Sequence, residues 1–315
     1  MAAVLTGHGA FIKYAKESTW GTAVSTTISN RINSVSIQKV QERNPKANLS
    51  VPASGVLGGL YDGFLRVEGS IELPVMYQGL GLLFEMALGD LATTGSGAPY
   101  THAFTPDISL PSATLEVQRG SGINNQMERF TGIKISTLAI SCEAGGEMTA
   151  AIDFIGKTSL ARTTNITSSF GSGVSVLHFH AATLDFGGAN YNVRSFTFTV
   201  NNNLERRDLL GSKQTAEPAI GDVRTITIEA TLDIEDDALY TAFLAGTQSN
   251  TVLNFTSGTD QIQFDLTNAL ITDHGDPVNA FGRVERTVTF TGLADSSNVG
   301  GKITLVNGDA TGIGN

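Results

Sequence analysis

The sequence has little cysteine and no long apolar run. Cys142 is the only cysteine among 315 residues, so the chain cannot form an internal disulfide or build a cysteine-based metal site. No apolar stretch approaches the length of a membrane-spanning helix, and residues 1–16 lack a basic segment followed by a long apolar one. These absences favour synthesis and folding in the cytosol, with no membrane partner.

Basic residues are also scarce. The chain has 20 Lys and Arg against 30 Asp and Glu, a formal net charge of −10. Residues 181–295 hold seven basic and sixteen acidic residues, a net charge of −9, so nearly all of the excess lies there. A surface that grips nucleic acid needs a basic stripe. The acidic balance therefore indicates either plain solubility or a surface past which DNA moves without binding.

A strand that runs directly into a short helix occurs twice in this sequence. Apolar and polar residues alternate from Val67 to Leu73, and apolar residues then recur at three- and four-residue spacings up to Gly89. The same change of period occurs between Val223 and Gly246. We therefore predict short helices that end at Gly89 and Gly246, and the repeated unit indicates a duplicated domain.

The order of the other expected elements repeats as well. In each half a strand (32–41 and 196–200) precedes a long polar segment with Gly and Pro (43–63 and 201–220), which we expect to be a loop. Residues 92–105 are expected to be a connection. Further strands are expected at 114–119, at 130–140 with a bulge near Gly132, and at 148–154 after the turn at 145–146, with counterparts at 253–255, 262–270 and 287–292.

The predicted fold is mainly β, with two tandem β-sandwich or barrel domains that each carry one short α-helix and a long inter-strand loop. The C-terminal stretch 298–315, which is rich in Gly, is expected to be a disordered end or an extra contact arm. The predicted boundaries are an N-terminal arm at 1–30, a first domain at 31–157, a linker at 158–180, a second domain at 181–295 and a tail at 296–315.

Catalytic and cofactor motifs are absent from the sequence, so we expect neither an enzyme nor a bound cofactor. His178 and His180 fall on one side of an expected strand and could share a metal, but the spacing implies no third ligand and favours a surface or packing role. The acidic residues at 233 and 235–237 lack the spacing of a calcium loop. They are better explained as acids near a helix N-terminus.

Three stretches carry a resemblance to a known family: residues 17–22 around Trp20, residues 73–88, and residues 130–134 with 150–156. With the repeated element order, they make the chain similar to the major tail tube proteins of long-tailed, siphovirus-like bacteriophages, in the duplicated-domain variant that forms trimer rings. Trp20 itself is expected to be a packing residue or an anchor at a subunit contact.

The resemblance implies a structural virion protein. Sheets of neighbouring subunits would close into a pseudo-hexameric ring of three chains around a channel, with the helix packed outside the sheet and the long loops reaching the adjacent ring. Stacked rings would form the tail tube through which DNA passes without specific binding. The implied partners are further copies of the chain, a tape measure protein inside the tube, and tail terminator and tip proteins.

The resemblance also assigns roles to particular residues. Acidic residues on strands would line the channel, and the loops would stack the rings. The candidates for the channel are Glu68, Glu72, Glu229 and Asp233, and those for stacking are Arg43, Asn44, Pro45, Lys46, Arg206, Arg207, Asp208 and Lys213.

Two other functions remain open at this point. A tandem β-sandwich binding module or adhesin would display exposed aromatic residues, whereas aromatic residues make up 7% of this chain and occupy mostly core-like positions. A tail terminator or baseplate ring protein would share the sheets but would not polymerise alone.

Overall fold

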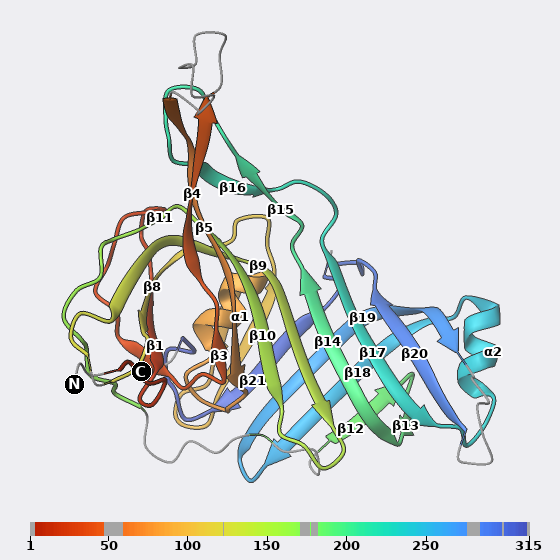
Figure 1. Cartoon of the computed structure of the whole chain (residues 1–315). Coiled ribbons are helices and arrows are strands. Elements are labelled where there is room, and N and C mark those ends of the chain that lie inside the picture. The colour runs from red at the N-terminus through yellow and green to blue at the C-terminus, as the bar shows by residue number, and fades with distance from the viewer. Residues whose placement is uncertain are drawn as a thin grey trace.

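The computed structural model describes residues 4–46, 59–121, 123–170, 177, 182–275, 284–297 and 299–313. The chain is mainly β, as predicted, with large antiparallel sheets (Figure 1). The helices are α1 Gly81–Leu88 and α2 Ala238–Ala245.

The strands fall into two series along the chain. The first series is β1 Phe11–Lys16, β2 Ile28–Asn30, β3 Ser34–Val35, β4 Gln38–Lys46, β5 Gly59–Pro74, β6 Gly89–Thr94, β7 Tyr100–Pro106, β8 Ala113–Gln118, β9 Met127–Glu143, β10 Thr149–Gly156 and β11 Thr158–Ser159. The second series is β12 Ala182–Phe186, β13 Ala189–Tyr191, β14 Val193–Asn201, β15 Leu204–Arg207, β16 Ala216–Ile220, β17 Thr225–Asp233, β18 Gln248–Ser257, β19 Asp260–Gly275, β20 Glu285–Gly292 and β21 Lys302–Asn307.

One antiparallel sheet, which we call the front sheet, runs through both series. Its strands follow one another in the order β4, β5, β10, β9, β14, β17, β20 and β19. Alternate side chains of these strands, such as Ile71, Ile140 and Phe198, are buried, as the sequence alternation predicts. Because β9 pairs with β14, the two halves of the chain are joined edge to edge.

Two further groups of strands pack against the front sheet. One group contains β2, β1, β8 and the first part of β9. The other runs β6, β7, β21, β19, β18, β12 and β13. The structure thus places part of the C-terminal tail, since β21 lies between β7 of the first half and β19 of the second. A single hydrophobic core contains side chains from both halves.

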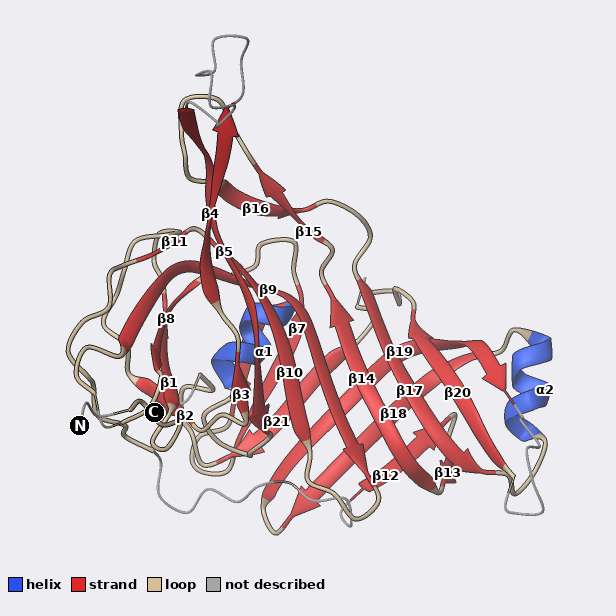
Figure 2. Ribbon diagram, viewed as in Figure 1, coloured by secondary structure: helices blue, strands red, loops and turns tan. Residues whose placement is uncertain are grey.

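The two helices differ in their surroundings (Figure 2). All eight residues of α1 are buried, and the helix contacts β9, β7, β6 and β21. The expectation that the helix packs outside the sheet is therefore wrong for α1, because β6, β7 and β21 enclose it. In α2 only Leu239 is buried, and the helix packs on β19. Both helices end where predicted, with Gly89 and Gly246 at positive φ.

The segments expected to be long loops contain paired strands. β4 extends to Lys46 and pairs with β5 as far as Gly59, and β15 pairs with β16 in a separate hairpin. The loop prediction for 43–63 and 201–220 is therefore wrong over these strands. The prediction failed because prolines are rare within strands. Pro45 is tolerated here because, among the described residues, β4 pairs with β5 alone, so that position 45 needs no backbone N–H toward a second strand.

Residues 92–105 are likewise not a plain connection, since they form most of the β6–β7 hairpin. His102 of β7 is fully buried, and its two ring nitrogens lie 2.9 Å from Thr93 Oγ1 and 3.1 Å from Asn307 Oδ1. The hairpin was missed because its residues are mostly polar. Its buried polar groups are satisfied by contacts with distant residues, which the sequence does not display.

Strand register repeats along the chain. β9 carries a bulged residue against β10 at Ser136, and β19 carries one against β20 at Thr272, 136 residues later. A second pair of irregularities, at Thr114 in β8 and Asn250 in β18, has the same spacing. The halves thus share the spacing of these irregularities, although the β6–β7 hairpin that follows α1 has no counterpart between α2 and β18. The domain boundaries stay a prediction, although β1 lies within the predicted N-terminal arm and pairs with β8.

Candidate functional site

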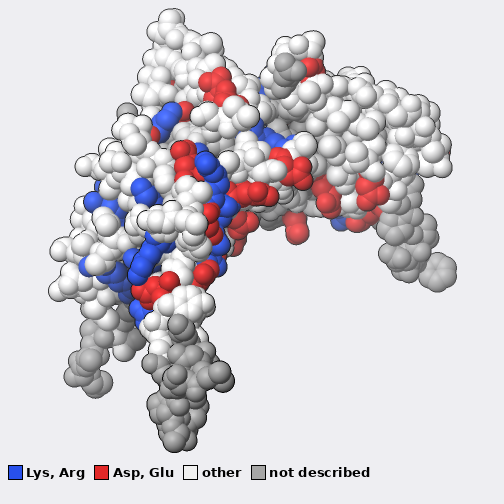
Figure 3. Space-filling view, turned by 90° about the horizontal axis from the view of Figure 1, so that it is seen from above, with Lys and Arg blue, Asp and Glu red and all other residues white. Residues whose placement is uncertain are grey.

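The exposed face of the front sheet is polar. Residues directly opposite each other on antiparallel strands point to the same side, so the register defines this face row by row. Figure 3 views the molecule from above, and the side that faces the viewer in Figure 1 is there the inward-curved lower outline, along which acidic atoms gather beside basic ones. One row across it consists of Glu72, Ala151, Ala139, Thr199, Thr227 and Thr291.

The predicted channel residues share this face. Glu72 belongs to the row given above, and Glu68 lies four residues before it on β5. Glu229 stands opposite Thr197 of β14, and Asp233 follows four residues later on β17. The structure thus brings the four acids onto one surface, while their role in a channel stays a prediction.

Further acids on this face were missed by the sequence analysis. Asp153 stands opposite Ser70, Glu143 opposite Ser195, and Glu285 opposite Asp233. Asp153 lies within the predicted strand 148–154, so counting its outward-facing positions would have found it, whereas Glu143 and Glu285 lie beyond the predicted ends of strands 130–140 and 287–292. The acidic character of the hollow face is therefore shared by both halves.

Part of this negative charge is neutralised within the chain. Arg66 pairs with Glu42 and Glu68, and Arg194 pairs with Glu285 and lies 3.8 Å from Asp233. Within the described ranges, no Lys or Arg forms an ion pair with Glu72, Glu143, Asp153 or Glu229. Because like charges on one hollow surface reinforce each other, the face carries a negative potential.

The predicted stacking residues gather at one end of the molecule. Arg43, Asn44, Pro45 and Lys46 stand in β4 opposite the start of β5. The 208–215 segment lies beside this hairpin, because Leu65 donates to the Lys213 carbonyl at 2.8 Å and forms a bridge with Gln214. The hairpins of the two halves therefore form one composite tip, visible above the sheets in Figure 1.

The charged residues at this tip bind each other. Lys213 Nζ lies 2.8 Å from Asp62 Oδ2, and this hydrogen bond and charge hold the pKa of Asp62 below its usual value. Arg206 pairs with Asp208 at 2.7 Å and lies 3.8 Å from Glu68. Arg207 stands in β15 and is exposed. The charges thus fix the tip within one chain, and their role between rings stays a prediction.

Exposed apolar side chains accompany these charges and were not singled out from the sequence. Leu210 is fully exposed, Leu209 is 52% exposed, and Leu60 and Tyr61 of the adjoining hairpin are 60% and 58% exposed. Apolar residues gathered at a projecting tip are typical of a contact surface. Tertiary pairing of the two hairpins creates this group, so the sequence alone does not show it.

The joint between β9 and β14 is held by Asn202, directly after β14. Its side chain is fully buried, and Nδ2 donates to the carbonyl oxygens of Ala87 at 2.9 Å and Ile135 at 3.0 Å. Its backbone N–H donates to the Ser136 carbonyl at 2.9 Å, and Arg224 Nε donates to its Oδ1 at 2.7 Å. Asn202 therefore ties the second half to the helix and the bulge of the first.

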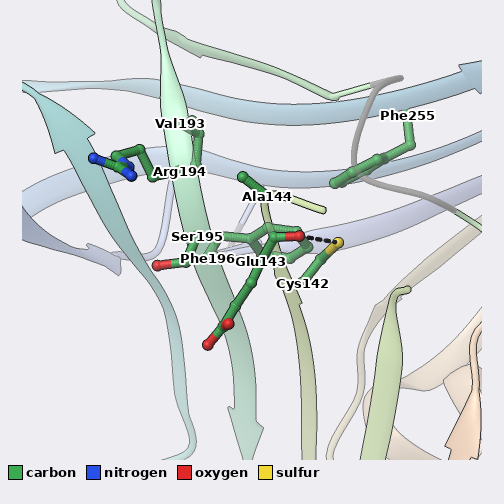
Figure 4. A pocket seen from close by; sticks show the side chains of 8 residues that line it. All are labelled: Cys142, Glu143, Ala144, Val193, Arg194, Ser195, Phe196 and Phe255. Atoms are coloured by element: carbon green, nitrogen blue, oxygen red, sulfur yellow. Dashed lines mark hydrogen bonds between the residues drawn. The ribbon is translucent and has the colours of Figure 1, made fainter. Parts of the chain in front are cut away.

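The cavities lined by described residues offer little for small-molecule chemistry. A cavity of ≈ 30 Å³ at the β9–β14 joint has room for about one water molecule (Figure 4). Burial raises the pKa of the Cys142 thiol, which lines it, so the thiol stays protonated. A larger hollow of ≈ 380 Å³ borders β15 and β16, where Lys134 pairs with Glu217 at 2.7 Å.

The remaining candidate residues have structural surroundings or lie elsewhere. Trp20 Nε1 donates to the Gly132 carbonyl at 3.1 Å, and Lys157 lies over its ring, which is the contact pattern of a packing residue. Asp236 Oδ1 accepts from the Ala238 N–H at the start of α2. His178 and His180 lie outside the described residues.

Across the described part of the chain, no group of three His, Cys, Asp or Glu is placed to hold a metal ion. No helix of that part is long and apolar enough to cross a membrane.

The chain matches the model of one known protein family. A search of curated proteins found no match to this chain. The family model of the phage tail tube protein matches residues 7–292, which include both helices and the strands from β1 to β20. Since this match covers most of the chain, the protein belongs to the phage tail tube protein family.

Proposed function

We propose that this protein is the building block of a phage tail tube, in which three chains close into a pseudo-hexameric ring and rings stack into a channel for DNA. Membership of the family makes it a structural component of the virion tail. The observation that carries the finer proposal is the hollow face of the front sheet, which both halves line with acidic side chains.

Electrostatics gives the hollow face its role in the channel. DNA carries about one negative charge per 1.7 Å of its axis, so a negative wall repels it and keeps it from adhering during passage. The hydroxyl and small side chains of Thr199, Thr227 and Ala139 between the acids offer DNA no cationic partner. A surface of this kind conducts DNA without specific binding.

Stacking is assigned to the composite tip. Its charged pairs hold the two hairpins together, whereas Leu210 is fully exposed and Leu209 is about half exposed. Contacts between unlike surfaces of successive rings propagate into a filament. The tape measure protein would occupy the channel, and terminator and tip proteins would close the ends of a tube whose subunits are made in the host cytoplasm.

Electron microscopy of the purified protein at high concentration tests this proposal. We expect filaments whose end-on averages show an open channel with a sixfold outline built from three chains. A protein that stays monomeric under all conditions would contradict the tube and favour a binding module, and rings that never stack would favour a terminator or baseplate protein.

The double variant Leu209→Ser and Leu210→Ser separates stacking from ring formation. Both side chains are exposed, so the substitutions should change the free energy of unfolding by less than about 0.5 kcal/mol. We expect single rings in place of filaments. The matched control is Leu160→Ser, which alters a 46% exposed leucine away from the tip and should leave filaments intact.

A further inference from the structure

The pairing of β9 with β14 joins the two halves of one chain, and it offers a model for a contact between two chains. In the joint, Asn201 of β14 stands opposite Thr137 of β9. The next pair along is hydrogen-bonded, because the Asn202 N–H donates to the Ser136 carbonyl. Since hydrogen-bonded pairs alternate with non-hydrogen-bonded ones, Asn201 and Thr137 form a non-hydrogen-bonded pair, whose side chains lie close together.

β9, the first strand of the joint, has its counterpart in β19, near the end of the second half of the chain. Ser136 and Thr272 are equivalent bulge residues, so the counterpart of Thr137 is Asp273. Beyond this bulge β19 pairs with β20, while among the described residues its ladder with β18 ends at Leu270. Among the described residues, Asp273–Gly275 thus form a backbone ladder with β20 and none with β18, at the place where β9 pairs with β14, and the His274 N–H donates to Asp273 Oδ1 at 2.8 Å.

β14, the second strand of the joint, has its counterpart near the start of the chain. Phe154 of β10 stands opposite Gly69, and the equivalent Phe290 of β20 stands opposite Ile228. Counting three residues back from each gives Arg66 of β5 and Thr225 of β17. These two residues stand opposite Val40 and Asn201 respectively.

Val40 and Gln41 of β4 thus correspond to Asn201 and Asn202 of β14. The Ser36 N–H donates to the Ser70 carbonyl of β5, so the backbone groups of Lys39 and Gln41 point away from β5 by the same alternation. The backbone N–H and C=O groups on the outer edge of β4 therefore stand at the positions equivalent to those through which β14 pairs with β9.

We propose that β4 of a second copy of this chain adds to β19 at Asp273–Gly275, in the register that places its Val40 opposite Asp273 and its Gln38 opposite Gly275. The inference rests on the proposed ring and names the contact that closes it. Strands at the edges of sheets pair readily with another strand, and this addition would give β4 and this part of β19 a second neighbouring strand.

The side chain that follows this pairing supports it. Asn202 corresponds to Gln41, so the joint within the chain and the contact between chains would both place a carboxamide beside a helix end and a bulge. Gln41 of the second copy would then donate to the carbonyl oxygens of Leu244 and Ile271, the counterparts of Ala87 and Ile135. Gln41 is exposed in the single chain, whereas Asn202 is fully buried.

Cysteine cross-linking tests the register with controls made from the same residues. Two double variants, Val40→Cys with Asp273→Cys and Gln38→Cys with Gly275→Cys, place thiols directly opposite each other in the proposed pairing. Two slipped variants, Val40→Cys with Gly275→Cys and Gln38→Cys with Asp273→Cys, place them diagonally. All four carry Cys142→Ala, and copper phenanthroline oxidises assembled protein before gel electrophoresis without reductant.

We expect about tenfold more disulfide-linked dimer and trimer from the opposite pairs than from the slipped ones, because diagonal Cβ atoms lie roughly 7–8 Å apart, beyond disulfide reach. Asn201→Cys with Thr137→Cys is the positive control, which should cross-link within one chain. Preferential linkage of a slipped pair, or rings seen by microscopy without linkage of either opposite pair, would overturn this contact and leave the tube in place. Absence of rings altogether would instead overturn the proposed function.

Discussion

The two helices of this protein occupy equivalent positions in the repeated strand order, yet one is enclosed and the other is open. Leu83 and Ala87 of α1 are 3% and 0% exposed. Counted back from the closing glycines, their counterparts in α2 are Tyr240 and Leu244, which are 43% and 66% exposed. The apolar content of the helices is alike, so the neighbours make the difference.

The first half has neighbours that the second lacks. The β6–β7 hairpin follows α1 directly, and β21 arrives from the C-terminus to pair with β7. After α2 the chain enters β18 at once. The first half is thus completed by the second, whereas α2 of the second half has only Leu239 buried, and the described end of β19 forms a ladder with β20 and none with β18. A further copy of the chain is the natural completion of such a unit.

The largest effect is expected from truncating equivalent residues of the two helices. Leu83→Ala removes a buried side chain from the closed half and should lower the free energy of unfolding by about 2–5 kcal/mol. Tyr240→Ala should lower it less, by about 1 kcal/mol, because Tyr240 is 43% exposed whereas Leu83 is 3% exposed. Urea denaturation of the unassembled protein measures both. Equal losses would mean that α2 is as enclosed as α1 in solution.

A smaller effect is expected at the two equivalent carboxamides. Asn202→Ala leaves the buried carbonyl groups of Ala87 and Ile135 without their donor and should cost about 1–3 kcal/mol of unfolding free energy. Gln41→Ala removes an exposed side chain and its hydrogen bond to Asp62, so it should lower the stability of the single chain by less than about 0.5 kcal/mol and reduce the yield of rings. Chemical denaturation and sedimentation measure these quantities. A Gln41→Ala variant that assembles normally would remove this residue from the contact between copies.

The smallest effect concerns the pair that links the two hairpins of the tip. Since Lys213 lowers the pKa of Asp62, the pair adds stability above the ordinary pKa of aspartate, and this is lost as the pH falls through the lowered pKa. Lys213→Met should raise the pKa of Asp62 back toward its usual value, as measured by a carbon NMR titration of the carboxyl group. Arg43→Met, which removes a weaker charge contribution, should raise it less. The reverse order would show that the hairpins are not joined as described.

Much of the fold could be read from local patterns. The alternation in β5, β9, β10 and β17, the glycines after both helices and the bulge of β9 near Gly132 are all properties of short stretches, and short-range backbone preferences govern them. The acidic candidates on β5 and β17 followed from the same alternation. The hairpins β6–β7 and β15–β16 were not predicted from the sequence because their residues are mostly polar. Contacts with distant residues stabilise such hairpins, as the contact of Asn307 with His102 does in β7.

The sequence by itself determined the mainly β class, the repeated unit of strand and helix, and the side of each strand that carries acids, because periodicity is written in neighbouring residues. Tertiary structure decided which helix is enclosed, where the C-terminal strand inserts and how two hairpins form one tip. These features join residues far apart in the chain, as Lys213 joins Asp62 and Asn202 joins Ala87. No local pattern encodes such pairings, since their free energy arises only when the folded core holds both partners in place.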